Sequence, residues 1–369
     1  MRVAIAGWFG SDNLGDEILL HTLMAAVRET REDASFVVLC PDPERVTELH
    51  RVDAVHMPTL RSRGTGERQE AAQRALREAD ILLLGPGTVF QERSPNLPWP
   101  GTLPLFARMV AMARLAGTRV AVAAAGVRED NTAAGRALLR WIGARCRAVG
   151  VRDQRSADTF GRGAQVVGDM AYTLRLPELG GIVRGQRFGL SLRPLASDAE
   201  ASLIAASAEV VQRLRGDGWS GVFLPMAYGR GANGENDATI YDRAFRDTLD
   251  VATSPLDAEQ PLAVNLDGWL TDLASYRLVL ATRLHAALPA VALGVPTVAI
   301  AYERKVLDAF HDLGLGEFTV GKDVDADTLY RTATAAAAAP EVFREAAGRV
   351  AVQGTVARGY IASVFKDLG

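Results

Sequence analysis

A histidine and three cationic side chains follow the ends of two predicted strands in the C-terminal part of the sequence. They are Arg283, His285, Arg304 and Lys305. The first strand, residues 277–281, leads through Thr282, a predicted N-cap, into a helix whose first turn carries Arg283 and His285. A helix N-terminus next to an arginine forms an anion site, and a histidine can donate a proton near neutral pH. A histidine by itself is more often structural, but three neighbouring cations favour a catalytic site for an anionic substrate.

A second segment with chemical character opens the sequence, GWFGSDNLGDE at residues 7–17, between a predicted strand and a predicted helix. Its glycines permit a tight turn, and Asp12 or Asn13 can cap a helix whose first turn contains Asp16 and Glu17. Carboxylates there stabilise the positive end of the helix dipole, but they would repel the phosphate that a P-loop lysine binds. The segment therefore suits helix capping alone, sugar hydroxyl groups, or contact with a basic second domain.

Other residues that suit ligand binding also follow predicted strands. They are Gly85, Gly87, Thr88 and Gln91 in LLLGPGTVFQE, Arg152 in GVRDQRSA, Asp169 in VGDMAY and Arg193 in FGLSLRP. The glycines let the backbone approach a ligand, and an arginine at the carboxyl end of a strand suits an anion. Two simpler interpretations remain open, a plain tight turn at the glycines and a surface ion pair between Arg152 and Asp153.

An alternation of predicted strands and helices must position these residues. Short apolar runs predict strands at residues 2–7, 35–40, 79–85, 118–126, 148–153, 165–169, 187–194, 221–226, 262–267, 277–281 and 296–302. Helices are predicted at 13–30, 67–78, 103–116, 133–145, 199–215 and 283–293, with two more in the alanine-rich segment 326–368. The polar segment 228–261 reads as a loop or a short helix. This pattern predicts the α/β class, with two doubly wound Rossmann-like domains facing a cleft in the glycosyltransferase-B style.

The predicted domains are residues 1–178, a linker at 179–186, a second α/β domain at 187–345, and a terminal helix at 346–369 that packs back on the first domain. The length of 369 residues also favours two domains. The linker is placed where glycine and proline interrupt the pattern.

Composition excludes several classes of protein. A net charge of −3 without a basic tail argues against a nucleic-acid partner. Cys40 and Cys146 are far apart, and no pair of histidines or cysteines has the spacing of metal ligands, so we expect no metal and no cofactor. The longest apolar run, residues 286–302, contains two prolines and reads as a helix and a strand, so no transmembrane segment is expected. A cytoplasmic enzyme or binding protein is the expectation, with a peripheral place at the inner membrane face left open.

Five of these segments, in this order, resemble the motifs of the polysaccharide pyruvyl transferase family. GWFGSDNLGDE resembles its N-terminal signature with two aromatic residues and N-x-G-D-E, and TRLHAALPAVALGVPTVAIAYERKV resembles its R-L-H, G-V-P and I-x-Y segment. These two motifs are the specific ones. LLLGPGTVFQE, GVRDQRSA and VGDMAY are similar to its glycine-rich, R-D-x-x-S and G-D-P-A elements. The resemblance covers about residues 3–306.

The resemblance implies transfer of a pyruvyl group from phosphoenolpyruvate to two hydroxyls of a sugar, giving a ketal and phosphate. It makes His285 the general acid, and candidate ligands for the anionic donor are Arg283, Arg152, Arg304, Lys305 and Arg193. The C-terminal domain would hold the donor and the N-terminal domain the acceptor. Asn13, Asp16 and Glu17 would then face the sugar or the domain interface.

The sequence departs from the family pattern at Pro86, Glu92, Met170 and Pro289. Pro289 should kink the helix after His285 and free the carbonyl of that histidine. These departures leave the acceptor open among a lipid-linked glycan, a nucleotide sugar and a small glycoside. Two other functions also stay open, a glycosyltransferase with a nucleotide-sugar donor on the same architecture and a non-catalytic binding protein of a polysaccharide assembly.

Overall fold

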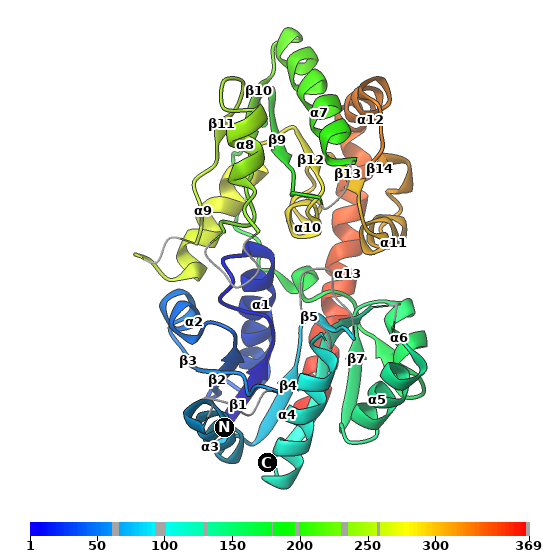
Figure 1. Cartoon of the computed structure of the whole chain (residues 1–369). Coiled ribbons are helices and arrows are strands. Elements are labelled where there is room, and N and C mark those ends of the chain that lie inside the picture. Colours follow the sequence, from blue (N-terminus) through cyan, green and yellow to red (C-terminus); the bar gives the residue numbers. More distant parts are fainter. Residues whose placement is uncertain are drawn as a thin grey trace. The chain divides into compact units, whose positions relative to one another are not determined.

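The computed structural model describes residues 1–60, 66–92, 101–128, 131–178, 180–195, 199–229, 235–256 and 259–366 (Figure 1). The chain forms two compact units. Unit 1 comprises Met1–Ser11, Asp16–Leu174 and Gln353–Gly369, and unit 2 comprises Asp12–Gly15 and Arg175–Val352. The short segment Asp12–Gly15 therefore belongs to unit 2, although the residues on both sides of it belong to unit 1.

Unit 1 is built on a parallel sheet of eight strands with the order β3-β2-β1-β4-β6-β7-β8, and β5 also pairs with β6. The strands are β1 (Arg2–Ala6), β2 (Ser35–Cys40), β3 (Asp53–His56), β4 (Ile81–Leu84), β5 (Gly87–Phe90), β6 (Arg119–Val127), β7 (Ala148–Val151) and β8 (Ala164–Val166). The strands β4 and β6 are continuous apolar runs because both faces of a parallel sheet are covered by helices.

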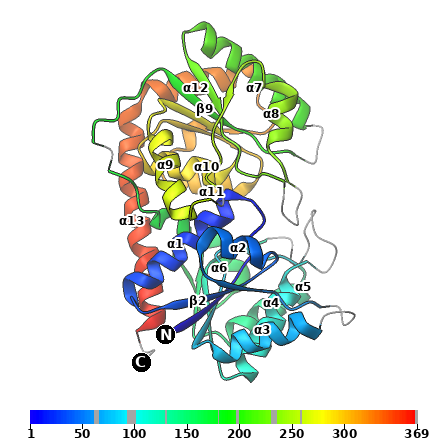
Figure 2. The ribbon, with the colours of Figure 1, turned by 90° about the vertical axis from the view of Figure 1, so that its left-hand side faces the viewer.

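The helices of unit 1 are α1 (Leu14–Thr30), whose first two residues belong to unit 2, α2 (Pro43–His50), α3 (Gly66–Glu78), α4 (Leu103–Leu115), α5 (Ala133–Gly143), α6 (Gln154–Phe160), the short 3-10 helix Met170–Thr173 and the last part of α13 (Pro340–Phe365). The helices α3, α4 and α5 pack with the strands in one apolar cluster, and Figure 2 shows them beside one another. Inside this cluster the ring of Phe90 meets Phe106 and Phe160 edge to face, at 5.6 and 5.5 Å between ring centres.

Unit 2 contains a parallel sheet of six strands with the order β11-β10-β9-β12-β13-β14. Its strands are β9 (Arg187–Ser191), β10 (Ser220–Phe223), β11 (Asp250–Val251), β12 (Leu278–Ala281), β13 (Thr297–Ala301) and β14 (Thr319–Gly321). Its helices are α7 (Ala199–Gly216), α8 (Ala238–Ala244), α9 (Leu262–Ala274), α10 (Leu284–Ala292), α11 (Arg304–Asp312), α12 (Ala326–Ala338) and the first part of α13. The helices α7 and α12 lie side by side (Figures 1 and 2) and are joined by an ion pair between Arg213 and Asp327, at 2.7 Å.

In both sheets the strand order reverses next to the first strand, which confirms the predicted pair of Rossmann-like folds. In unit 2 the reversal lies between β9 and β12, and the chain leaves these strands toward Arg193 and Arg283. In unit 1 it lies between β1 and β4, which lead into the loops that start at Gly7 and Gly85. Ligands of open α/β sheets bind at the carboxyl ends of the strands at such a reversal.

Most predicted elements match the structure, and the errors have identifiable causes. Residues 262–267 were expected to form a strand but begin α9, because Leu262, Leu266 and Trp269 are buried at helical spacing after Pro261. The segment 228–261 contains the short helix α8 and the edge strand β11. Within the described residues, no helix is long and apolar enough to cross a membrane.

The last part of α13 is fixed to the sheet of unit 1 by Tyr360. Its hydroxyl donates a hydrogen bond to the carbonyl oxygen of Val122 in β6, at 2.6 Å, and only 6% of the residue is exposed. Gly150 in β7 makes room for the ring, since a Cβ atom there would lie 2.4 Å from it.

We expect Tyr360→Phe to lower the free energy of unfolding by about 1 kcal/mol, because a buried hydrogen bond is lost without a change in ring packing. Urea denaturation followed by circular dichroism measures this change. Tyr330→Phe is the control, because its hydroxyl bonds Asp217 at the surface of unit 2 and its loss should leave the curve almost unchanged. Coincident curves for Tyr360→Phe and the wild type would contradict the assignment.

Candidate active site

Arg283 forms the centre of a polar network in unit 2. It follows β12 directly, and its side chain is only 7% exposed. Its Nε and Nη2 atoms donate to the carboxylate of Asp237, at 3.2 and 2.5 Å, and its Nη1 atom donates to Oε2 of Glu235, at 2.9 Å. Burial alone would lower the pKa of this guanidinium, but the two carboxylates outweigh burial and raise the pKa above its usual value.

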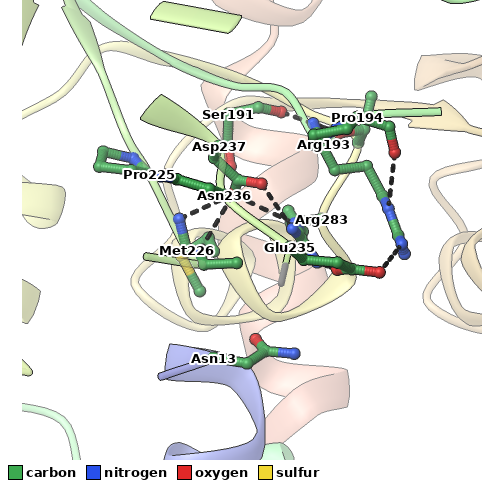
Figure 3. A network of polar contacts seen from close by, with 12 residues as sticks. Asn13, Ser191, Arg193, Pro194, Pro225, Met226, Glu235, Asn236, Asp237 and Arg283 are labelled. Atoms are coloured by element: carbon green, nitrogen blue, oxygen red, sulfur yellow. Dashed lines mark hydrogen bonds and ion pairs between the residues drawn. The ribbon is translucent and has the colours of Figure 1, made fainter. Parts of the chain in front are cut away.

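Arg193 joins the same network from the end of β9. Its Nη2 atom lies 2.5 Å from Oε1 of Glu235, so this carboxylate binds one arginine with each of its oxygens (Figure 3). Its Nη1 atom donates to the hydroxyl of Tyr302, at 2.6 Å, and the guanidinium lies over that ring at 4.6 Å. On the other side, the Nζ atom of Lys305 lies 5.7 Å from the centre of the Tyr302 ring. The structure therefore brings together three of the predicted cations.

Asp237 connects Arg283 to the N-terminal segment of the chain. It is completely buried, and its Oδ2 atom accepts hydrogen bonds from the backbone N–H groups of Met226 and Ala227, at 2.9 and 3.2 Å. The carbonyl of Met226 in turn accepts from Leu14, at 2.7 Å, and Ala227 forms an antiparallel bridge with Asn13. Figure 3 shows Asn13 at the edge of this network. Strand-like pairing therefore explains why Asp12–Gly15 belongs to unit 2.

The same segment packs against His285, which lies in the first turn of α10. A Cβ atom on Gly15 would lie 2.5 Å from the Nδ1 atom of the imidazole, so only glycine fits this position without moving the ring. Of the two predicted cap residues, Asn13 caps α1, because its Oδ1 atom accepts a hydrogen bond from the N–H group of Gly15 at 3.1 Å. The Nε2 atom of His285 is shielded from solvent, and the residue as a whole is half-buried.

The segments after the neighbouring strands β12 and β13 differ from the prediction at the start of α10, where Arg283 is the N-cap residue. Thr282 was expected to cap α10, but its hydroxyl accepts the N–H group of Arg193 at 2.9 Å and bonds the carbonyl of Ser191. Arg304 and Lys305 lie in the first turn of α11, and Lys305 is paired with Glu303 at 2.7 Å. The side chain of Arg304 is exposed.

Glu17 holds the opening loop of unit 1 in place. Its Oε1 atom accepts the N–H group of Gly10, at 2.8 Å, and its Oε2 atom lies 2.8 Å from Nε2 of His50. The side chains of Glu17 and His50 are 0% and 1% exposed. The sequence indicated no role for His50, which is in fact the buried partner of this carboxylate. The acidic residue therefore fixes the turn from within.

Arg152 gathers several predicted site residues in unit 1. Its Nε atom lies 3.0 Å from Asp153, and its Nη1 atom lies 3.4 Å from the hydroxyl of Thr88 and 4.0 Å from Asp169. Only 11% of the Arg152 side chain is exposed, so the pair with Asp153 is not a surface ion pair. Burial works against the charge of Arg152, but Asp153 and Asp169 raise its pKa above the usual value. Gly126 leaves room for the guanidinium, since a Cβ atom there would lie 3.0 Å from Nη2.

The glycine-rich loop beside this cluster has a specialised backbone. Gly85 and Gly87 have φ angles of 102° and 92°, and the peptide bond between Gly85 and Pro86 is cis. A side chain at Gly85 would meet the carbonyl of Ala123 at 2.8 Å, and one at Gly87 would lie 3.8 Å from Oδ1 of Asp16. These positions therefore require glycine, and Asp16 lies beside this loop.

Two further side chains of this loop are used inside unit 1. The amide of Gln91 donates to the carbonyl of Thr88 at 2.5 Å. The carboxylate of Glu92 accepts the N–H and hydroxyl groups of Thr132, at 2.6 and 2.7 Å, where α5 begins. Both side chains stabilise the loop from within.

Sequence reasoning missed Glu235 and Asp237, the two carboxylates that organise the site in unit 2. The segment that contains them was interpreted as a polar loop, and its only signal was two acidic residues close together just before a helix. Their importance depends on a contact with an arginine 46 or 48 residues later in the chain, which no local pattern reveals.

Comparison with solved structures finds two-domain Rossmann-like enzymes. A putative UDP-N-acetylglucosamine 2-epimerase from Listeria monocytogenes superposes with a TM-score of 0.63 at 13% identity, covering 100% of this chain and 96% of that one. The UDP-GlcNAc 2-epimerase from Neisseria meningitidis bound to UDP-GlcNAc gives 0.58 at 11% identity, with 100% of both chains covered. The spinosyn rhamnosyltransferase SpnG gives 0.56 at 11% identity, covering 99% of this chain and 100% of that one. At such low identity the likeness concerns the fold, which is of the glycosyltransferase-B type.

No curated protein matches the chain by sequence. The model of one protein family, described as polysaccharide pyruvyl transferase, matches residues 13–304. This match includes Asn13 and Gly15, the Arg152 cluster, and the network of Arg193, Glu235, Asp237, Arg283 and His285. The chain therefore belongs to the polysaccharide pyruvyl transferase family, and it is a transferase of polysaccharide biosynthesis.

Proposed function

We propose that this protein transfers a pyruvyl group from phosphoenolpyruvate to two hydroxyls of a sugar, with His285 as the general acid. The observation that carries the proposal is the position of Arg193 and Arg283 at the strand-order reversal of unit 2, with His285 two residues further along α10. A small donor with a carboxylate and a phosphate group needs more than one cation, and protonation of its methylene carbon needs an acid nearby.

The donor would bind through its carboxylate and phosphate groups to the cations of unit 2. Arg193 is held by the hydroxyl of Tyr302 and Arg283 by the carboxylate of Asp237, so both are preorganised before the donor arrives. Lys305 lies beside the ring of Tyr302 and would add charge on the same side. Fixed cations stabilise a charged transition state without the cost of reorienting solvent.

The chemistry proceeds in three steps. His285 gives a proton to the C3 methylene carbon, which becomes a methyl group and leaves an oxocarbenium-like C2 atom. A sugar hydroxyl attacks C2 and releases its proton, and the C2–O bond to phosphate then breaks. A second hydroxyl attacks C2 and completes the ketal. One of the two hydroxyl protons restores the proton that His285 gave to C3. The other leaves with hydrogen phosphate.

The Arg152 cluster of unit 1 suits the acceptor. The charges of Asp153 and Asp169 outweigh that of Arg152, so this cluster does not attract an anionic donor. The hydroxyl of Thr88 and the carboxylate of Asp169 are groups that bind sugar hydroxyls well. This assignment follows the family, which implies a sugar or glycan acceptor.

A glycosyltransferase reaction with a nucleotide-sugar donor is the second candidate. It is favoured by one observation, the similarity of the fold to enzymes solved with UDP or UDP-GlcNAc. This donor would also use cations at the strand ends of unit 2, but it would need no acid to protonate a carbon atom.

Ligand-induced thermal stabilisation separates the two candidates. Phosphoenolpyruvate at tens of times its dissociation constant should stabilise the protein by about 2 kcal/mol. UDP and UDP-GlcNAc at the same concentrations should have little effect. Stabilisation by the UDP ligands without any by phosphoenolpyruvate would favour the second candidate.

We expect His285→Ala to lower turnover at least about 100-fold, because a positioned general acid contributes this much to the rate. The fold should survive, since the histidine is only half-buried. Product formation from phosphoenolpyruvate and a panel of sugars, followed by mass spectrometry, measures the effect. The control is His311→Ala, which changes an exposed histidine on α11. A folded His285→Ala protein with near-normal turnover would remove the acid assignment.

Gly15→Ala tests the placement of the imidazole without changing it chemically. The new Cβ atom would lie 2.5 Å from Nδ1 and 3.0 Å from the Cβ and Cγ atoms of His285, so the ring must move. Turnover should fall about 100-fold, the typical effect of a misplacement of about 1 Å. Gly268→Ala is the matched control, because this helical glycine of α9 has no atom within 4 Å of the added Cβ atom. Equal turnover of the two variants would show that the Gly15 contact is unimportant.

A further inference from the structure

We propose that Glu235 occupies the place of the donor's carboxylate between Arg193 and Arg283, and that the donor must displace it to bind. This inference rests on the proposed function and adds a residue that sets the affinity and the selectivity of the donor site. Glu235 is thereby an internal competitor for the two arginines that the donor needs.

The geometry around Glu235 is that of a bound ligand. Its Oε1 atom lies 2.5 Å from Nη2 of Arg193, and its Oε2 atom lies 2.9 Å from Nη1 of Arg283. These are charge-assisted hydrogen bonds of the kind that the carboxylate of a ligand also accepts from arginine. The two arginines extend from the ends of β9 and β12, where the strand order of this sheet reverses and ligands of such folds bind.

The two carboxylates of the network differ in how easily they can leave. Asp237 is completely buried and holds the backbone N–H groups of Met226 and Ala227, so its departure would leave buried donors unpaired. The side chain of Glu235 is 21% exposed, so its carboxylate can exchange the arginines for water. Glu235 is therefore the one of these two that a ligand can replace.

Displacement would proceed by rotation of the Glu235 side chain, with the backbone kept in place. Its backbone carbonyl accepts the N–H group of Gly229 at 2.8 Å, and the next residue, Asn236, is bridged to Tyr228. These bonds fix the backbone at Glu235 and Asn236. The carboxylate can therefore turn away while Asp237 keeps Arg283 in position.

Charge explains how this competition affects selectivity. The formal charges of Arg193 and Arg283 are balanced by those of Glu235 and Asp237, so the four groups together attract no anion. When the Glu235 carboxylate turns away, the remaining three carry one positive charge locally, which a ligand carboxylate can neutralise. Ligands without an anion that fits between the two arginines leave Glu235 in place.

The substitution Glu235→Gln tests this role, because glutamine keeps the size of the side chain but loses the charge that holds both arginines. Isothermal titration calorimetry should give a phosphoenolpyruvate dissociation constant about tenfold lower than that of the wild type, equal to about 1.4 kcal/mol. Pyruvate, used as a probe that carries the carboxylate alone, should also bind more tightly. Glu235→Ala should act in the same direction, which covers a glutamine variant that fails to fold.

Two control variants make the result specific. In Glu200→Gln the same charge is lost from a carboxylate that is 22% exposed and lies 2.6 Å from Arg243, and donor affinity should not change. In Asp237→Asn the partner that fixes Arg283 is weakened, and donor affinity should fall.

The outcomes separate this inference from the proposed function. If phosphoenolpyruvate binds the wild type but binds Glu235→Gln equally or more weakly, Glu235 positions the arginines and the inference is overturned, while the proposed function stands. If phosphoenolpyruvate binds none of the variants and UDP binds all of them, the proposed function fails, and the assignment of Glu235 to a donor carboxylate fails with it.

Discussion

A guanidinium that has lost almost all contact with water needs carboxylates around it, and this requirement organises unit 2 around Arg283. Asp237 supplies the permanent partner, and its second set of hydrogen bonds fixes the backbone at Met226 and Ala227. That backbone pairs with Asn13 and Leu14, which brings Gly15 against the ring of His285. One buried ion pair thus determines where Arg283 and His285 lie. Such a pair is strongly destabilising to break on one side only, so the arrangement is expected to be rigid.

Both clusters of the protein follow the same electrostatic rule. Arg152 in unit 1 is buried between Asp153 and Asp169, as Arg283 in unit 2 is between Asp237 and Glu235. Arg152, Arg193 and Arg283, three of the cations that the sequence suggests for an anionic donor, are therefore compensated before any ligand binds. A count of basic residues near a site overstates its attraction for anions, and the relevant quantity is how easily each compensating carboxylate can leave.

The sequence predicted the architecture well because its signals are local. Apolar runs that end in glycine identified β1, β4 and β6, and the positions of Arg193, Arg283 and Arg152 at strand ends followed from the same runs. The failures concern signals that are not local. Leu262 and Leu266 fit a short strand as well as a helix, and only the buried Trp269 and Leu270 further along decide for the helix. Glu235, Asp237 and His50 have no pattern of their own, because each acquires its role from a partner more than 30 residues away. Residues with a recognisable motif were found, whereas the carboxylates that hold Arg283 and the histidine that pairs with Glu17 were not.

The two units are not continuous segments of the sequence. Four residues near the start of the chain, Asp12–Gly15, complete unit 2, while Asp16 and Glu17 directly after them belong to unit 1. A fragment that begins at Arg175 would lack the strand partner of Ala227 and the glycine that packs on His285. Cutting the chain between the two units would therefore remove residues of unit 2 together with unit 1. The imidazole of His285 keeps its native surroundings only in a polypeptide that includes both units.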